Sequence, residues 1–136
     1  MIEISRINHV GLRVTNLEVT RSFYEKLGFE FIVGPVGPEP VAIMEHPSGV
    51  NINFILNSND STTHNVLMDV PDKHTGYTHI ALEVGDLVAT QTALESLGLT
   101  ITEGPVVTPE GASFIFIRDP DANVIEFHKP AGKEGA

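Results

Sequence analysis

The sequence predicts an α+β fold made of two tandem βαβββ modules, because the chain repeats itself and both halves show the same succession of apolar patterns. Shifted by 70 residues, residues 9–36 align without a gap on residues 79–106, and eleven of these 28 positions are identical. The alignment resumes at a shift of 73, where residues 47–54 align on residues 120–127. We therefore expect two modules of the same architecture.

The first module is expected to begin with a strand over residues 7–14, in which apolar and polar side chains alternate. Asn16 can then cap a helix, and Gly28 suits the left-handed residue that follows a helix end. Three further strands complete the module, at residues 30–33, 41–45 and 51–56.

The second module repeats this order, with a first strand over residues 78–84 and a helix between Asp86 and Gly98. Its remaining strands are expected at residues 100–102, 113–118 and 124–128. Helical spacing predicts that the buried faces of the two helices consist of Leu17, Thr20, Tyr24 and Leu27, and of Leu87, Thr90, Leu94 and Leu97.

Both modules are expected to belong to one domain over residues 1–136. Module one covers about residues 5–56 and module two about residues 77–130. The connection at residues 57–76 is polar and has no periodic apolar pattern. Its two histidines, His64 and His74, are therefore interpreted as solvated loop residues.

Composition excludes several classes of function. Eighteen acidic and eight basic residues give a formal charge of −10, which argues against nucleic acids and anionic membranes as partners. The chain has no cysteine, so thiolate metal sites and disulfides are excluded. No apolar run approaches the length of a membrane span, and the first residues do not resemble a signal peptide. We expect a cytoplasmic protein.

Polar side chains occupy equivalent positions on one face of the predicted strands. His9 and His79 share a position of the repeat, and Glu126 in the last strand aligns on Asn53. Two imidazoles and one carboxylate fit a divalent-metal site that leaves positions open for substrate or water. A lone strand histidine is more often a satisfied polar residue, but its duplication favours a metal site of His9, His79 and Glu126.

Four stretches resemble the vicinal oxygen chelate superfamily, which includes glyoxalase I, fosfomycin-resistance transferases, extradiol dioxygenases and bleomycin-binding proteins. They are INHV at residues 7–10, SFYEKLGF at 22–29, GYTHIA at 76–81 and DPDANVIE at 119–126. The last resembles the family's closing DPDGxxxE pattern, with Ala122 in place of glycine.

The resemblance implies that the paired βαβββ modules form a curled mixed sheet around a cleft. It also implies a divalent Zn, Ni, Fe or Mn ion in that cleft, held by residues of the first and last strands. It transfers the ligand roles to His9, His79 and Glu126. The fourth family position is a glutamate in bacterial-type glyoxalase I, where it can also act as the base, and here it is Asn53. An amide is a weak ligand and cannot abstract a proton, so Glu126 is the catalytic candidate. The family also implies a homodimer, often with the site assembled across it.

The favoured function is a metal-dependent glyoxalase-like lyase or isomerase that acts on a small oxygenated substrate chelated to the ion. One alternative is a metal-free ligand-binding protein of the bleomycin-resistance type. Another is a three-ligand thiol transferase or extradiol dioxygenase, since these family members use two histidines and one glutamate.

The candidates for substrate contacts are the polar-face residues Arg13, Asn53, Tyr77 and His128. For Arg13 a structural role is equally open. Its repeat counterpart is Glu83, which has the opposite charge, so the two could form an ion pair.

Overall fold

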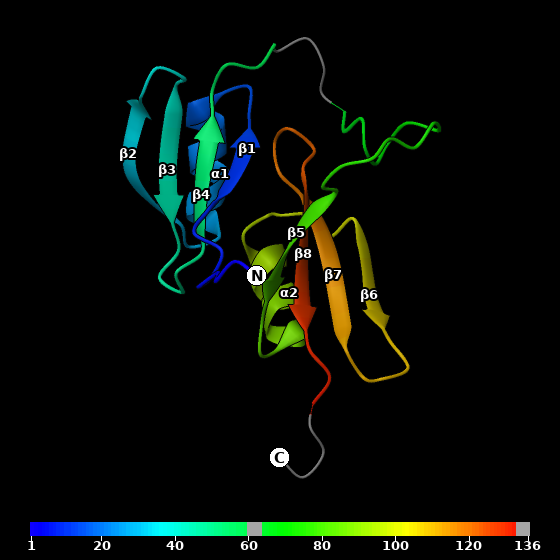
Figure 1. Cartoon of the computed structure of the whole chain (residues 1–136). Coiled ribbons are helices and arrows are strands. Elements are labelled where there is room, and N and C mark those ends of the chain that lie inside the picture. The colour runs from blue at the N-terminus through cyan, green and yellow to red at the C-terminus, as the bar shows by residue number, and fades with distance from the viewer. Residues whose placement is uncertain (60–63, 133–136) are drawn as a thin grey trace. The chain divides into compact units, whose positions relative to one another are not determined.

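The computed structural model of the chain describes residues 1–59 and 64–132 and divides into two compact units, Met1–Thr62 and Thr63–Ala136 (Figure 1). The first unit contains β1 (Val10–Arg13), α1 (Leu17–Lys26), β2 (Glu30–Val36), β3 (Val41–Glu45) and β4 (Asn51–Ile55). The second contains β5 (His79–Glu83), α2 (Leu87–Ser96), β6 (Glu103–Val107), β7 (Ser113–Arg118) and β8 (Val124–Lys129). The predicted βαβββ order is confirmed in both halves.

Each unit has its own four-stranded mixed sheet, with strand order β1-β4-β3-β2 in the first and β5-β8-β7-β6 in the second. The strands pair in the same register in both sheets. Gly11 faces Asn53 across the parallel pair β1–β4, as Ala81 faces Glu126 across β5–β8. The α+β class is therefore confirmed, although the predicted curled sheet is present as two separate sheets that do not close.

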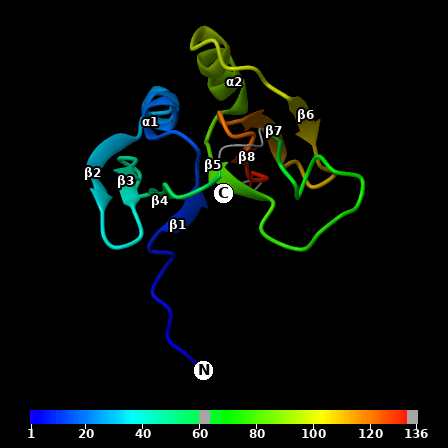
Figure 2. The same cartoon turned by 90° about the horizontal axis from the view of Figure 1, so that it is seen from above.

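The predicted helix caps are confirmed. The side chain of Asn16 accepts a hydrogen bond from the Val19 N–H at 3.0 Å, and that of Asp86 accepts one from the Ala89 N–H at 3.0 Å. Gly28 and Gly98 follow the helices with φ of +98° and +76°, the left-handed conformation in which glycine carries no Cβ penalty. Figure 2 shows each helix on one side of its own sheet.

The buried helix faces differ in part from the prediction. In α1 the buried residues are Thr20, Phe23 and Tyr24, whereas only Leu87 and Leu94 are buried in α2. Leu27 and Leu97 are the C-cap residues, so they leave the helical face, and Leu97 is 41% exposed. The core of the first unit contains an aromatic cluster, in which Tyr24 packs against Phe23, Phe29 and Phe54 with ring centroids 4.9 to 5.6 Å apart.

The first strand is shorter than predicted, since residues 7–9 lie outside the ladder. Its parallel partner β4 is preceded by a turn, closed by a hydrogen bond from the His46 N–H to the Val50 carbonyl at 2.8 Å. The parallel ladder of β1 and β4 begins at the pair of Val10 and Ile52, so the residues before Val10 are not part of it. Strand β5 likewise starts at His79 rather than residue 78.

Strand β2 starts at Glu30 as predicted but extends beyond the predicted end at residue 33, and β6 lies later in the sequence than predicted. Both strands run through a Gly-Pro pair, and β6 lies at Glu103–Val107 instead of residues 100–102. Each is an edge strand, where a missing N–H is tolerated, and each ladder shifts register at this point. A Cβ on Gly104 would lie 2.8 Å from the Phe114 carbonyl oxygen, so glycine is required there.

The connection has no helix or strand over its described residues 57–59 and 64–76, as predicted, and residues 60–63 lie outside the described part. Its C-terminal part is bound to the second unit. The two terminal nitrogens of Arg118 donate to the Asp69 carboxylate at 2.8 and 2.9 Å, and Asn65 Nδ2 donates to the Ala122 carbonyl at 3.2 Å. His64 and His74 are exposed.

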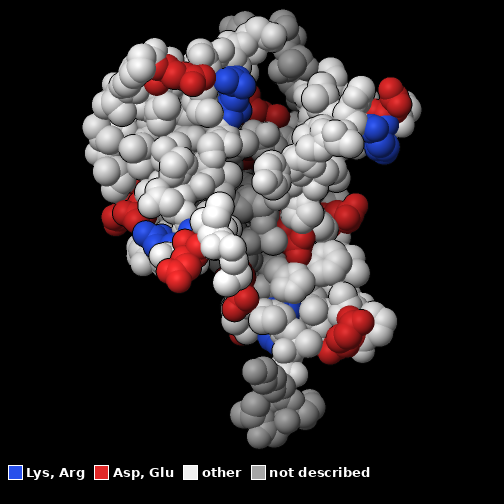
Figure 3. All heavy atoms as spheres, in the orientation of Figure 1, with Lys and Arg blue, Asp and Glu red and all other residues white. Residues whose placement is uncertain are grey.

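The charged side chains of the surface are mostly acidic, in line with the composition (Figure 3). On the face shown in Figure 3, acidic side chains are scattered and the few Lys and Arg form no patch. No helix in the described residues has both the length and the apolarity to cross a bilayer.

Candidate functional site

The second sheet brings His79, Glu126 and His128 together on one face. His79 is the first residue of β5, and Glu126 and His128 lie two apart on the adjacent strand β8, so all three point to the same side. The intervening Ile125 and Phe127 are buried on the other side, against the core. The alternation predicted for these strands is therefore confirmed.

Glu126 lies between the two histidines. Its Oε1 is 3.0 Å from His79 Nε2 and its Oε2 is 2.6 Å from His128 Nδ1. The Glu126 side chain is 9% exposed, whereas both imidazoles are 35% exposed. A nearly buried carboxylate thus has each oxygen matched to a ring nitrogen, as burial of such a group requires.

Two phenylalanines of β7 flank this group. Phe116 faces Glu126 in the ladder, and its ring meets that of His79 edge-on with centroids 5.8 Å apart. Phe114 faces His128 and stacks on it, with centroids 5.9 Å apart and planes 4° from parallel. These rings limit the positions that the two imidazoles can take.

The contact of His79 Nδ1 with Thr78 is compatible with either a proton or a cation at Nε2. Nδ1 lies 2.9 Å from the Thr78 hydroxyl, which can donate to Nδ1 or accept from it. Thr78 therefore supports both tautomers of the ring. In the tautomer with its proton on Nδ1, the Nε2 lone pair is directed toward Glu126 Oε1.

Imidazole nitrogen and carboxylate oxygen are ligands of transition-metal ions, and two atoms 3.0 Å apart can both reach one ion at about 2.1 Å. The pair of His79 and Glu126 fits a divalent ion in this respect. Within the described residues, no group of three or more His, Asp or Glu side chains is placed to hold a metal ion. His9, the predicted third ligand, belongs to the first unit.

The equivalent position of the first unit has different chemistry. His9 precedes β1 and is exposed, and its Nδ1 lies 2.9 Å from Asn8 Oδ1. Asn53 is half-buried on β4, between Gly11 and Ile43. The repeat thus places an amide here, and the carboxylate with its histidine partners occurs in the second unit.

The sequence matches the model of the Glyoxalase/Bleomycin resistance protein/Dioxygenase superfamily over residues 6–127. The chain belongs to this superfamily. It is 32% identical to a lactoylglutathione lyase of Haemophilus influenzae over 130 residues, which cover 90% of both chains.

Solved structures share the fold. A glyoxalase family protein from Enterococcus faecalis aligns with a TM-score of 0.73 and 25% identity, over 90% of this chain and 96% of that one. A lactoylglutathione lyase from Agrobacterium tumefaciens, 19% identical, aligns with a TM-score of 0.69 over 94% of this chain and 96% of that one. The resemblance stated from the sequence motifs is confirmed.

Two other residues of this superfamily member were predicted to contact substrate. Arg13 lies 3.3 Å from the Glu39 carboxylate and donates to Asn57 Oδ1 at 3.2 Å, so it forms an ion pair within the first unit. Tyr77 precedes β5 and is 98% exposed. Neither residue belongs to the cluster around Glu126.

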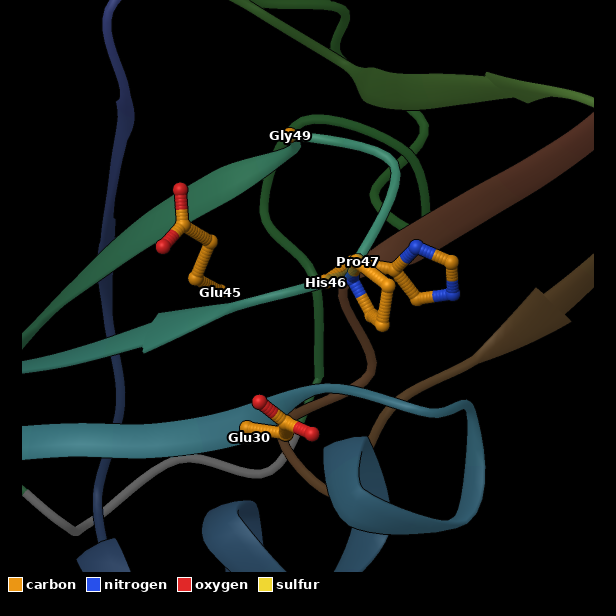
Figure 4. Close-up of a pocket in the computed structure, with 5 residues that line it drawn as sticks. All are labelled: Glu30, Glu45, His46, Pro47 and Gly49. Atoms are coloured by element: carbon orange, nitrogen blue, oxygen red, sulfur yellow. The ribbon is translucent and has the colours of Figure 1, made fainter.

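A shallow hollow of about 210 Å³ lies beside β2 and β3 of the first unit, lined by Glu30, Glu45, His46, Pro47 and Gly49 (Figure 4). None of the predicted site residues lines it. His46 has a structural role there, because its Nδ1 bonds Ser48 and its ring packs against Phe29. No residue of the Glu126 cluster lines the hollow.

Sequence reasoning missed Phe114, Phe116 and Thr78. The signal for the phenylalanines was available, because the strand Ser113–Arg118 pairs with β8 and alternation places its even-numbered residues on the Glu126 face. Thr78 gives no signal in the sequence, since its role depends on a side-chain rotamer.

Proposed function

We propose that this chain is a metal-dependent lyase or isomerase of the glyoxalase group, acting on a small substrate that binds a divalent ion through adjacent oxygens. His79 and Glu126 are proposed as ligands of the ion, with His9 as the third. His9 is included because it occupies the position of His79 in the first repeat.

One observation carries the proposal, namely the 3.0 Å approach of His79 Nε2 to Glu126 Oε1, beside the ring of Phe116. A buried carboxylate is costly to maintain, and here it has one oxygen directed at a partly exposed imidazole. Membership of the superfamily and the name of the Haemophilus influenzae relative support lyase chemistry over a purely structural ion pair.

A divalent ion at this position supplies Lewis acidity that polarises a carbonyl oxygen. Glu126 is the proposed base, because it supplies the carboxylate of the cluster with His79 and His128. Asn53 cannot take that role. The two halves of the repeat therefore have unequal roles in the proposed chemistry.

Tyr77 and Asn53 are candidates for substrate contacts, whereas Arg13 is held by Glu39. The superfamily also suggests a homodimer, which light scattering of the purified protein can measure.

The experiment is metal analysis of the purified chain combined with turnover of lactoylglutathione, assayed in both directions. We expect about one divalent ion per chain, activity that disappears with a chelator and returns with metal, and loss of both properties in His79→Ala. His74→Ala is the matched control, because His74 is an exposed histidine of the connection.

The identity of the ion separates the reaction types. Zinc or nickel supports lyase or isomerase chemistry, iron supports dioxygenation, and manganese supports thiol transfer. If the protein holds no metal and His79→Ala changes neither metal content nor ligand binding, the enzyme proposal fails. A metal-free ligand-binding protein then takes its place.

A further inference from the structure

His128 stands out because of the contact that it makes rather than its exposure. Its Nδ1 lies 2.6 Å from Glu126 Oε2, the shorter of the two contacts that the histidines make with this carboxylate. An ionised carboxylate only accepts hydrogen bonds, so the hydrogen of this bond belongs to His128 Nδ1. A short bond to a charged acceptor is of the stronger kind.

The imidazole of His128 is itself held in place. It stacks almost parallel on Phe114, which is its direct neighbour across the antiparallel pair β7–β8. The position of the ring is thus set by the sheet. A donor fixed in this way occupies Oε2 and leaves Oε1 turned toward His79.

Comparison of the two repeats links His128 to Glu126. The residue of the first unit that corresponds to His128 is Ile55, which faces Arg13 in β1 as His128 faces Glu83 in β5. The residue that corresponds to Phe114 is Val41, which pairs with Ile55. Where the first sheet has Asn53 in place of the carboxylate, it therefore lacks both the imidazole donor and its stacking partner.

We propose that His128 is a positioning residue that holds Glu126 through Oε2, so that Oε1 is presented beside His79 Nε2 for the ion. This role replaces the substrate contact predicted from the sequence, and it rests on the proposed metal-dependent function. Hydrogen-bond partners of metal ligands act by orienting them, and their removal costs about 10- to 100-fold in metal affinity.

Two substitutions of His128 separate the effect of its hydrogen-bond donor from the effect of its aromatic ring. His128→Phe keeps an aromatic ring to stack on Phe114 but has no donor. His128→Asn loses the ring but places an amide N–H near the position of Nδ1–H. His74→Ala is again the control for loss of an imidazole elsewhere. Thermal unfolding of each metal-free variant verifies that it is folded.

The measurement is titration of the metal-free protein with Co²⁺, followed by the visible absorption of the bound ion. We expect His128→Phe to bind Co²⁺ about 10- to 100-fold more weakly than the wild type, with an altered absorption spectrum. His128→Asn is expected to stay within about threefold of the wild type and to keep its spectrum, since the donor rather than the ring sets the carboxylate.

Other results contradict the proposal. If His128→Phe binds Co²⁺ with wild-type affinity and spectrum, or if His128→Asn is the weaker binder, His128 acts through packing and the positioning role is wrong. Either outcome leaves the metal site itself intact. If the wild type does not bind Co²⁺, the proposed function and the positioning role fail together.

Discussion

Asn53 and Glu126 occupy equivalent positions in two sheets with the same strand pairing. Across the parallel strands, Asn53 faces Gly11 and Glu126 faces Ala81. Across the antiparallel strands, Asn53 faces Ile43 and Glu126 faces Phe116. Their surroundings differ, because Glu126 bonds two imidazoles while Asn53 lies between a glycine and an isoleucine. The two repeats therefore share the same backbone pairing but differ in the chemistry of this position.

Substitutions of these two side chains are expected to lower turnover to different extents. Glu126→Gln keeps the shape but removes the charge and the base, and should lower metal-dependent turnover by about 100-fold or more. Asn53→Ala, the matched change in the other repeat, should alter turnover less than tenfold. Initial rates and bound metal per chain measure both. Equal losses in the two variants would contradict the division of roles.

Sequence reasoning recovered what local rules determine. The repeat, the caps at Asn16 and Asp86, and the alternation that places His79 and Glu126 on one face all depend on short-range pattern. The end of β2 and the position of β6 differ from the prediction, because both strands run through a Gly-Pro pair that is tolerated at a sheet edge, and edge position is a tertiary property.

The finer features of the site depend on side-chain contacts between elements. No pattern in the sequence predicts that Asp69 of the connection forms an ion pair with Arg118, or that Arg13 forms one with Glu39. His128 was found as a polar-face residue, but its stacking on Phe114 and its bond to Glu126 follow from register and rotamer together. The sequence therefore indicated the residues of the cluster better than their roles.

Thr20 is expected to be replaceable by valine without loss of stability. It is 1% exposed, and its Oγ1 has no hydrogen-bond partner in the described part of the chain. Its repeat counterpart Thr90 donates to the Asp86 carbonyl at 2.8 Å. Removing an unsatisfied buried hydroxyl should raise the free energy of unfolding by about 1 kcal/mol.

Thr90→Val is the control for Thr20→Val, because it removes a hydroxyl that is bonded. It should give no gain, and urea unfolding compares the two. A Thr20→Val protein less stable than the wild type would show that its hydroxyl is satisfied in solution.

Replacement of Ala122 by glycine is expected to stabilise the folded protein. It has a φ of +64°, in the left-handed region that costs a residue with a Cβ about 1 kcal/mol. Its counterpart Gly49 has a φ of +98° and open space where a Cβ would stand. Ala122→Gly should therefore raise the free energy of unfolding by up to about 1 kcal/mol, and Gly49→Ala should lower it by a similar amount. Denaturant titrations that gave both changes the same sign would refute this account.

The ion pair of Asp69 and Arg118 should make stability depend on acid pH. The hydrogen bond from Arg118 lowers the pKa of Asp69 from 3.8 to about 2. Because the folded pKa lies below the unfolded one, this stabilisation is complete above about pH 4 to 5 and is lost as pH falls through 2.

Asp69→Asn tests this dependence. The stability difference between wild type and variant should be constant from pH 5 to 8 and shrink between pH 4 and 2. Urea unfolding across this range measures it, and a difference that persists unchanged at pH 2 would exclude Asp69 as the titrating group.

Anomalous scattering from crystals of the metal-loaded protein tests the proposed metal centre most directly. The account predicts one peak per chain, about 2.0 to 2.2 Å from both His79 Nε2 and Glu126 Oε1, which disappears in His79→Ala crystals. A loaded protein whose peak lies elsewhere, such as the hollow beside Glu30 and Glu45, or whose crystals show no peak, would contradict it.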